Sequence, residues 1–418
     1  MTKGRDASEV DRHYLAVPYG ERGSARAAGA RWDRDARSWY LPEGEDLSRV
    51  QRWRTEEGAA ELASAEFTSV SDPRQEFVRV LLDMGAKVTG RHPMMDGRRH
   101  RIAVEGDRGS ERAGSYVGYL DGVVPAGHML NFRTGLNIKW KASGGRLDEA
   151  SWSRLRAELA QARHRREVAR SARQRAVAGW VRERLSELAP VRVPTPYLVD
   201  KGIGVHPGVF TDGAGATIIP AMDFAGVWTL QTIGTSGEKR FTRHGRKSGC
   251  FHVIGGLDGL PGARALVVAE GYATAATLAE LLGQPVVAGF DGGNLVAVAK
   301  ALRAHYPQKP IVVVGDDDLA GELNPRIARN SGEVHARDAA NAVGGHLVLP
   351  VFAPGEQGRD PRRFSDFNDL ATRSALGRDA AQRQIRQAVG QAIGLHGRSH
   401  RPALGLKRER SARRGRGR

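Results

Sequence analysis

The chain has 418 residues, and its 64 Lys and Arg against 47 Asp and Glu give a formal net charge of +17. A globular protein this basic usually meets a polyanion: nucleic acid is the leading candidate, and an acidic membrane surface is the alternative. No apolar run approaches the about 18 residues of a membrane span, the first residues lack the apolar core of a signal peptide, and the single cysteine, Cys250, excludes a disulfide framework or a cysteine-rich zinc site. We therefore expect a soluble, cytoplasmic protein without zinc.

Residues 12–55 are expected to form a small α+β accessory domain. A strand at 13–17, a helix at 21–28 and a second strand at 38–41 fit its pattern. Its aromatic residues Trp32, Trp39 and Tyr40 could stack on bases, but core packing is the favoured interpretation in so small a unit.

Residues 74–146 predict a second small α+β domain, and basic segments follow. An amphipathic helix at 74–84 ends at Gly85, and short alternating segments broken by glycines then indicate a β-meander. Residues 147–190 predict a long helical linker, rich in arginine, that serves as a connector or as a surface for a nucleic-acid backbone. The basic tail, residues 396–418, has little apolar content and is expected to be disordered and to contact phosphates.

The strongest chemical signal lies in residues 263–395. Four apolar runs, at 265–269, 285–289, 311–314 and 346–349, alternate with helical patterns, which predicts an α/β domain built on a parallel sheet. Ligands of such sheets bind at the carboxyl ends of the strands. The acids expected at that edge are Glu270, Asp316, Asp318 and Asp366.

These acids predict a metal site. Asp316 and Asp318 are two residues apart, so both can face one side of an extended segment. Clustered carboxylates repel one another unless cations neutralise them, and oxygen ligands favour Mg²⁺ or Mn²⁺. Two such ions would stabilise the attacking and leaving oxygens of phosphoryl transfer. The alternative is that the aspartates are ordinary turn residues and helix caps.

The segment VVAEGYATAATL at 267–278, the DDD run at 316–318 and the DFND string at 366–369 resemble the TOPRIM fold of bacterial primases, topoisomerases and some nucleases. The resemblance implies that Glu270, Asp316 and Asp318 are catalytic and that these three and Asp366 bind metal. Residues 191–262 resemble the primase subdomain that precedes TOPRIM. There the resemblance implies nucleotide- or template-binding basic groups: Lys239, Arg240, Arg243, Arg246 and Lys247.

Two further stretches resemble more specific groups of proteins within the primases and mobile-element enzymes. Residues 94–135 resemble the N-terminal domain of TraC-type conjugative primases, and residues 14–42 resemble an accessory domain attached to mobile-element DNA enzymes. The resemblance implies a magnesium-dependent DNA primase that makes RNA primers from ribonucleoside triphosphates on single-stranded DNA. It also implies a role in plasmid or mobile-element replication and conjugation, with a replicative helicase as a candidate partner. A TOPRIM nuclease and a non-catalytic single-strand-binding protein remain as alternatives.

Two weaker signals are also present. Gly292 and Gly293 follow the second apolar run, where their backbone N–H groups could approach a phosphate or simply form a loop. Cys250 and His252 suggest a metal pair, but a buried thiol and a structural histidine are the favoured interpretation.

Overall fold

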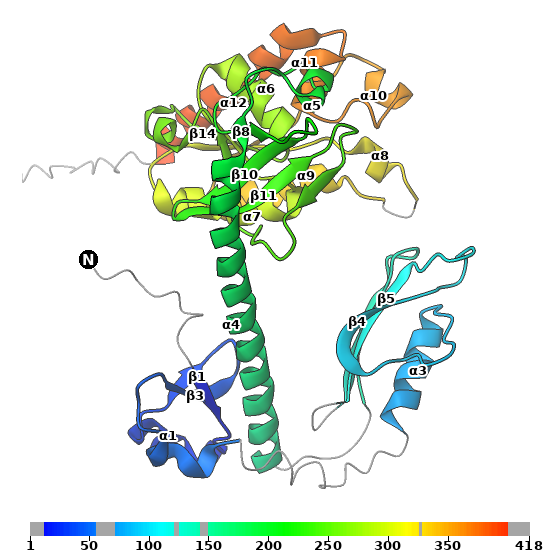
Figure 1. The fold of residues 1–418 in the computed structure, drawn as a ribbon, viewed down its shortest axis with the longest axis vertical. Coiled ribbons are helices and arrows are strands. Elements are labelled where there is room, and N and C mark those ends of the chain that lie inside the picture. The colour runs from blue at the N-terminus through cyan, green and yellow to red at the C-terminus, as the bar shows by residue number, and fades with distance from the viewer. Residues whose placement is uncertain (1–11, 56–71, 121–124, 143–148, 326–327, 400–418) are drawn as a thin grey trace, which may run out of the picture. The chain divides into compact units, whose positions relative to one another are not determined.

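The computed structural model describes residues 12–55, 72–120, 125–142, 149–325 and 328–399. It has the mixed α/β architecture expected from the sequence, and it divides into two compact units, residues 1–173 and 174–418 (Figure 1). Of the expected disordered tail, residues 396–399 are helical, so the expectation is wrong for them, and the rest, from residue 400 onward, lies outside the described residues.

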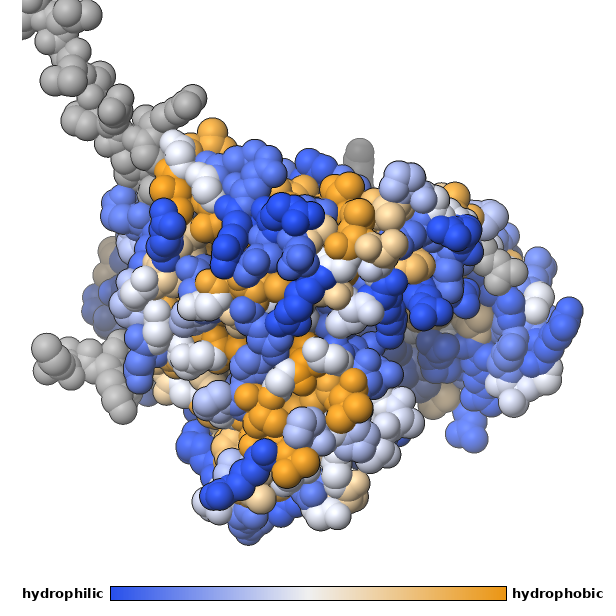
Figure 2. Space-filling view, turned by 90° about the horizontal axis from the view of Figure 1, so that it is seen from above, coloured by the Kyte–Doolittle hydropathy of each residue, from blue (hydrophilic) through white to orange (hydrophobic). Residues whose placement is uncertain are grey.

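No helix in the described part of the chain is both long enough and apolar enough to cross a membrane. On the face that Figure 2 displays, hydrophobic residues form small groups among hydrophilic ones.

The first unit begins with a three-stranded antiparallel sheet of order β1-β3-β2. Its elements are β1 (Arg12–Leu15), η1 (Tyr19–Glu21), α1 (Arg22–Ala27), β2 (Arg31–Asp33), β3 (Ser38–Pro42) and η2 (Leu47–Trp53). The expected strand, helix and strand are present. The sequence did not indicate β2, because its three residues show no apolar alternation. Trp39 packs in the core as expected, but Trp32 is 46% exposed, so the core interpretation is wrong for Trp32.

The expected helix and meander follow in the same unit. They are α3 (Pro73–Asp83), β4 (Asp96–Ile102), β5 (Gly114–Tyr119), β6 (Ala126–Asn131) and β7 (Asn137–Lys141), with the strands in chain order. Phe77 of α3 stacks on Trp140, with ring centroids 5.0 Å apart. A Cβ at Gly127 would lie 2.5 Å from the Phe77 ring, so only glycine lets the helix approach the sheet this closely.

The basic linker forms one long helix, α4 (Glu149–Glu187). Its first half belongs to the first unit, where the Tyr14 backbone N–H donates to Gln161 Oε1 over 2.8 Å. Its last turns belong to the second unit, where Val181 packs with Ile218 and Leu230. Each end is therefore held by its own unit.

The second unit contains an antiparallel sheet of order β12-β11-β10-β9-β8. Its elements are β8 (Ala189–Pro190), α5 (Pro196–Asp200), β9 (Phe210–Thr211), β10 (Thr217–Asp223), β11 (Gly226–Ile233) and β12 (Lys239–Phe241).

The other sheet of this unit has the order β13-β15-β14-β16-β17. The four expected strands pair in parallel: β14 (Leu266–Ala269), β15 (Val286–Ala288), β16 (Ile311–Val314) and β17 (His346–Val348). An additional strand, β13 (His252–Ile254), pairs antiparallel with β15. The sequence pattern did not assign β13 to this sheet.

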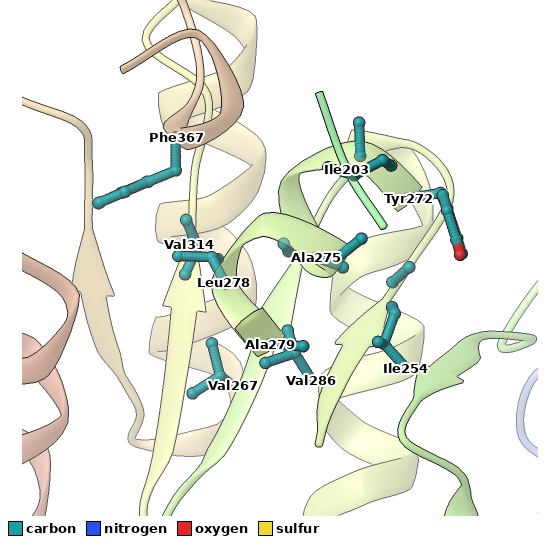
Figure 3. Close-up of a cluster of buried hydrophobic side chains, with 14 of the residues drawn as sticks. Ile203, Ile254, Val267, Tyr272, Ala275, Leu278, Ala279, Val286, Val314 and Phe367 are labelled. Atoms are coloured by element: carbon teal, nitrogen blue, oxygen red, sulfur yellow. The ribbon is translucent and has the colours of Figure 1, made fainter. Parts of the chain in front are cut away.

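Helices cover both faces of the parallel sheet. The covering helices are α6 (Tyr272–Leu282), α7 (Gly292–His305), α9 (Ser331–Val343), α11 (Phe367–Thr372) and α12 (Gly377–Ser399). The unit also contains the short helices η3 (Leu257–Gly262), α8 (Leu319–Glu322) and α10 (Glu356–Arg359). Figure 3 shows Ala275, Leu278 and Ala279 of α6 beside Val267 and Val286 of the sheet. The opposite face packs mainly against α7 and α9. Burial on both faces explains why these strands are continuous apolar runs.

Glu280 connects α6, the loop after α5 and α12. Its carboxylate accepts hydrogen bonds from Gly204 N at 2.8 Å, His206 Nε2 at 3.2 Å and Arg378 Nη2 at 2.6 Å. Burial alone would raise the pKa of Glu280, but these partners lower it to about 2. A depressed carboxyl pKa stabilises the fold above the ordinary value of the unfolded chain, and that stability is lost as the pH falls toward the folded value.

We expect Glu280→Gln to lower the free energy of unfolding of the second unit by about 1–2 kcal/mol at pH 7, because a charge-assisted network is lost. The deficit should shrink as the pH falls from about 4.5 toward 2. Denaturant titrations across this range would measure it. Glu322→Gln, at an exposed site, should change stability little; equal losses in both variants would contradict the role of Glu280.

Candidate active site

Glu270 stands at the carboxyl end of β14, where the chain turns into α6. The backbone N–H of Gly292, at the start of α7, donates to its carboxylate. Burial raises the pKa of Glu270 and repulsion from Asp291 adds to the rise, whereas the Gly292 bond, His335 and Lys239 act against it. Glu270 is thus a partly desolvated acid to which the start of α7 donates one hydrogen bond.

Asp316 follows β16, the strand next to β14. Its Oδ1 atom is buried and has no hydrogen-bond partner among the described residues. Burial raises the pKa of Asp316 well above its usual range, and Asp366, Glu270 and Asp369 raise it further, while Lys239 acts against the rise. The structure therefore brings several carboxylates close enough to repel one another.

The middle residue of the DDD run has a different place. Asp317 accepts from Asn330 Nδ2 at 2.7 Å and from Gln357 Nε2 at 2.8 Å, and its N–H donates to the Ser365 carbonyl at 2.7 Å. Asp316 and Asp318 line one cavity, whereas Asp317 fastens the loop behind them. This is the alternation expected of an extended segment.

Two of the four expected acids also cap helices. Asp318 accepts from Gly321 N at 3.0 Å at the start of α8. Asp366 accepts from Asp369 N at 2.8 Å at the start of α11 and from Thr274 Oγ1 at 3.1 Å. Helix capping, the alternative to metal binding, therefore does occur at both positions.

Glu270, Asp316 and Asp318 line a cavity of about 390 Å³, whereas Asp366 is not part of the lining. Its lining residues are Glu270, Asp291, Gly292, Gly293, Asp316, Asp318, Ser331, Gly332, His335 and Ser365. Within the described ranges, no group of three or more His, Cys, Asp or Glu side chains is arranged to hold a metal ion. Mg²⁺ is, however, often held by only one or two carboxylates together with waters and phosphates. The unpaired oxygen of Asp316 and the neighbouring Glu270 could hold such an ion.

The expected basic residues separate into two groups. Loss of surrounding water and repulsion from Lys201 lower the pKa of Lys239, against the attraction of Asp366, Asp316 and Glu270. The positive charge of Lys239 therefore attracts the acids. Much of the Lys239 residue is nevertheless exposed to solvent. Lys247 forms an ion pair with Asp291 at the cavity, 2.5 Å between Nζ and Oδ2.

None of the five expected basic residues is part of the cavity lining, and the other three differ from Lys239 and Lys247 in their surroundings. Arg246 pairs with Asp223 and lies over the Trp228 ring, 3.7 Å from its centroid. Arg240 follows Lys239 in β12, and adjacent strand residues point to opposite faces. Arg243 is exposed after that strand.

Sequence reasoning missed His335, Lys201 and Asp369. His335 lies on α9 and acts on Glu270, and Lys201 follows α5 and acts on Lys239. No local sequence pattern marks either residue. Asp369 was noted beside Asp366 but not assigned to the site; burial and repulsion from Asp366 raise its pKa.

Comparison with known families assigns two segments. Residues 12–54 match a domain of unknown function, DUF5710, and residues 265–376 match the Toprim domain. Residues 265–376 form a Toprim domain. The expected TOPRIM fold is therefore confirmed, and the acid cluster described above lies within it.

Most of the chain is similar to proteins named DNA primase TraC. One, from Escherichia coli, is 42% identical over 94% of this chain and 42% of its own length. Another, also from Escherichia coli, is 40% identical over 93% of this chain and 30% of its own length. The expected resemblance to TraC-type primases is confirmed, and the chain spans less than half the length of these relatives.

Solved primase structures also resemble the chain. The E. coli primase catalytic core is 17% identical over 47% of this chain and 62% of its own, with a TM-score of 0.28. The zinc-binding and RNA polymerase domains of Aquifex aeolicus primase are 12% identical over 77% of this chain and 86% of theirs, with a TM-score of 0.32.

The loop that carries Asp316 packs directly against α9 at Gly332. A Cβ at this position would overlap the carbonyl oxygen of Asp316 and lie 2.9 Å from its Cβ. We expect Gly332→Ala to lower the free energy of unfolding by about 1–3 kcal/mol, because backbone must move to admit the methyl group. Calorimetry of the full chain measures the effect.

Gly390→Ala is the matched control, since Gly390 lies in α12 with open space around its Cβ position. Alanine is the better helix former, so this variant should be neutral or more stable by up to about 1 kcal/mol. A Gly332→Ala protein as stable as the control would show that the loop and α9 are not closely packed.

Proposed function

We propose that the chain is a DNA primase that makes short RNA primers on single-stranded DNA by metal-dependent nucleotidyl transfer. Similarity to DNA primase TraC over 94% of the chain supports this activity, and a role in plasmid or mobile-element replication and conjugation. The observation that carries the proposal is the acid cluster of the Toprim domain, in which Asp316 has a buried, unpaired oxygen and Lys239 stands against the acids.

Mg²⁺ or Mn²⁺ is the proposed cofactor, held by Glu270 and Asp316 with Asp318 and Asp366 beside them. When bound, such an ion stabilises the charge that develops on the oxygens of a phosphoryl group. Three observations support this fit: the ligands are oxygens, one is buried without a partner, and the cluster carries an excess of negative charge.

The chain's own residues have separate proposed tasks. Lys239 supplies positive charge to an incoming triphosphate beside the acids. Glu270, to which the Gly292 N–H donates, either holds the ion or exchanges a proton with the attacking hydroxyl at its carboxylate oxygens. Lys247, which is ion-paired with Asp291, supplies further positive charge for the template backbone, and so does the helix α4.

We assign the proposed nucleotide contact within β12 to Lys239 and not to Arg240, since Lys239 is the one that acts on the acids. We expect Lys239→Ala to reduce kcat/KM for ribonucleotides by about 10- to 100-fold, because a charge-assisted contact to phosphate is lost. Arg240→Ala, its neighbour on the opposite face of the strand, should change kcat/KM less than about threefold. The measurement is primer synthesis from labelled ribonucleotides on single-stranded DNA with Mg²⁺.

The same assay separates the alternatives. Primer synthesis by the wild-type chain, sensitive to Lys239 and not to Arg240, is the expected result. Cutting of single-stranded DNA with no primer made would identify a Toprim nuclease instead. DNA binding with neither reaction would identify a non-catalytic binding protein.

A further inference from the structure

A second cavity lies within the first unit, where the DUF5710 segment meets the first turns of α4. It encloses about 720 Å³, within the roughly 300–1,000 Å³ typical of ligand sites. Its walls come from η1, α1, β2, β3 and the first turns of α4. The lining residues are Leu15, Val17, Tyr19, Gly20, Arg22, Gly23, Arg26, Trp32, Arg37, Ser38, Trp39, Ser153 and Arg156.

Aromatic rings form one part of this cavity. Trp39 is buried in the core, and Trp32 stands edge-on to it with ring centroids 5.6 Å apart. Trp32 is 46% exposed and Tyr19 is 67% exposed, so both rings keep surface free for a ligand. The core of this small domain is closed by other residues, among them Leu41 and Trp53. Core packing therefore does not account for the exposed face of Trp32.

All charged side chains that line the cavity are positive. Four arginines line it, Arg22, Arg26, Arg37 and Arg156, and its lining contains no carboxylate. The Arg22 guanidinium lies over the Tyr19 ring, 3.2 Å from its centroid. A cavity with flat aromatic surface and only positive charges suits a ligand that carries an aromatic ring and phosphate together.

The arginines of α4 indicate that the ligand of the cavity is a nucleic-acid strand and not a free nucleotide. Arg156, Arg163 and Arg170 are exposed and seven residues apart, so they lie on one face of the helix, about 10 Å from one to the next. This row begins at the cavity wall and leads away from it. A nucleic-acid backbone that enters the cavity can continue along the row, whereas a single nucleotide has no use for it.

We propose that this cavity is a single-stranded DNA site in which a base stacks on Trp32 and the flanking phosphates pair with the arginines. An unstacked base offers a face for the tryptophan ring, and such stacking is tolerant of sequence. Guanidinium groups bind phosphate oxygens with paired hydrogen bonds. The assignment is independent of the Toprim chemistry, because it concerns binding by a different domain.

Photo-crosslinking of the full chain tests the site directly. Oligothymidylate carrying 5-iododeoxyuridine is irradiated with the protein, and the attached peptide is identified by mass spectrometry. We expect attachment within residues 19–39, lost in Trp32→Ala and kept in Trp32→Phe, which preserves an aromatic face. Attachment confined to other parts of the chain in the wild-type protein would overturn the proposal.

Binding measurements provide a second, independent readout. By fluorescence anisotropy, Trp32→Ala should weaken binding of the oligonucleotide by about five- to tenfold. Arg26→Gln should reduce the slope of log K against log salt by about 0.7, as for one lost phosphate contact. Arg34→Gln, an exposed arginine of the same domain outside the cavity, should leave the slope unchanged.

Competition identifies the occupant. Unlabelled oligothymidylate should abolish the crosslink, and ATP at equal nucleotide concentration should not. Displacement by ATP alone would show a free-nucleotide pocket and overturn the proposal, as would identical slopes for Arg26→Gln and the wild-type chain. Arg26→Gln keeps the test decisive even if Trp32→Ala destabilises the small domain.

Discussion

Repulsion among buried carboxylates is the constraint on which the Toprim site depends. Parallel strands end at one edge of their sheet, so Glu270 and Asp316 are neighbours because β14 and β16 are neighbours. Asp366 and Asp369 add negative charge beside them, and Lys239 opposes it. In a partly desolvated site this repulsion is much stronger than in water. Such a group of acids is relieved by taking up protons, which their raised pKa values favour, or by the cation proposed above.

The scaffold holds this unfavourable charge in place with contacts outside the cavity. Asp317 is fixed by Asn330 and Gln357, so the loop carrying Asp316 keeps its direction. Gly332 lets α9 pack directly on the same loop. Local stability is thus supplied by neutral and paired groups, and the unpaired oxygen of Asp316 is left for a ligand. Such a division is common where a site must stay strained to be useful.

The sequence was sufficient for the parts of the site that local pattern determines. Buried strands appear as apolar runs, and the acids that follow them were predicted at one edge, where Glu270, Asp316 and Asp318 line one cavity. Features that depend on pairing across the chain were not predictable: β13 joins the sheet through β15, and His335 approaches from α9. The difference between Lys239 and Arg240 could have been predicted, since it follows from strand alternation alone.

Mn²⁺ binding, followed by electron paramagnetic resonance of the free ion, tests the central claim most directly because it needs no substrate. We predict that the wild-type chain binds Mn²⁺, that Asp316→Asn weakens the affinity at least about tenfold, and that Mg²⁺ competes. Asp338→Asn changes an exposed carboxylate that does not line the cavity, so this variant should bind Mn²⁺ nearly as the wild type does. Equal affinity in the wild-type and Asp316→Asn chains would contradict the account.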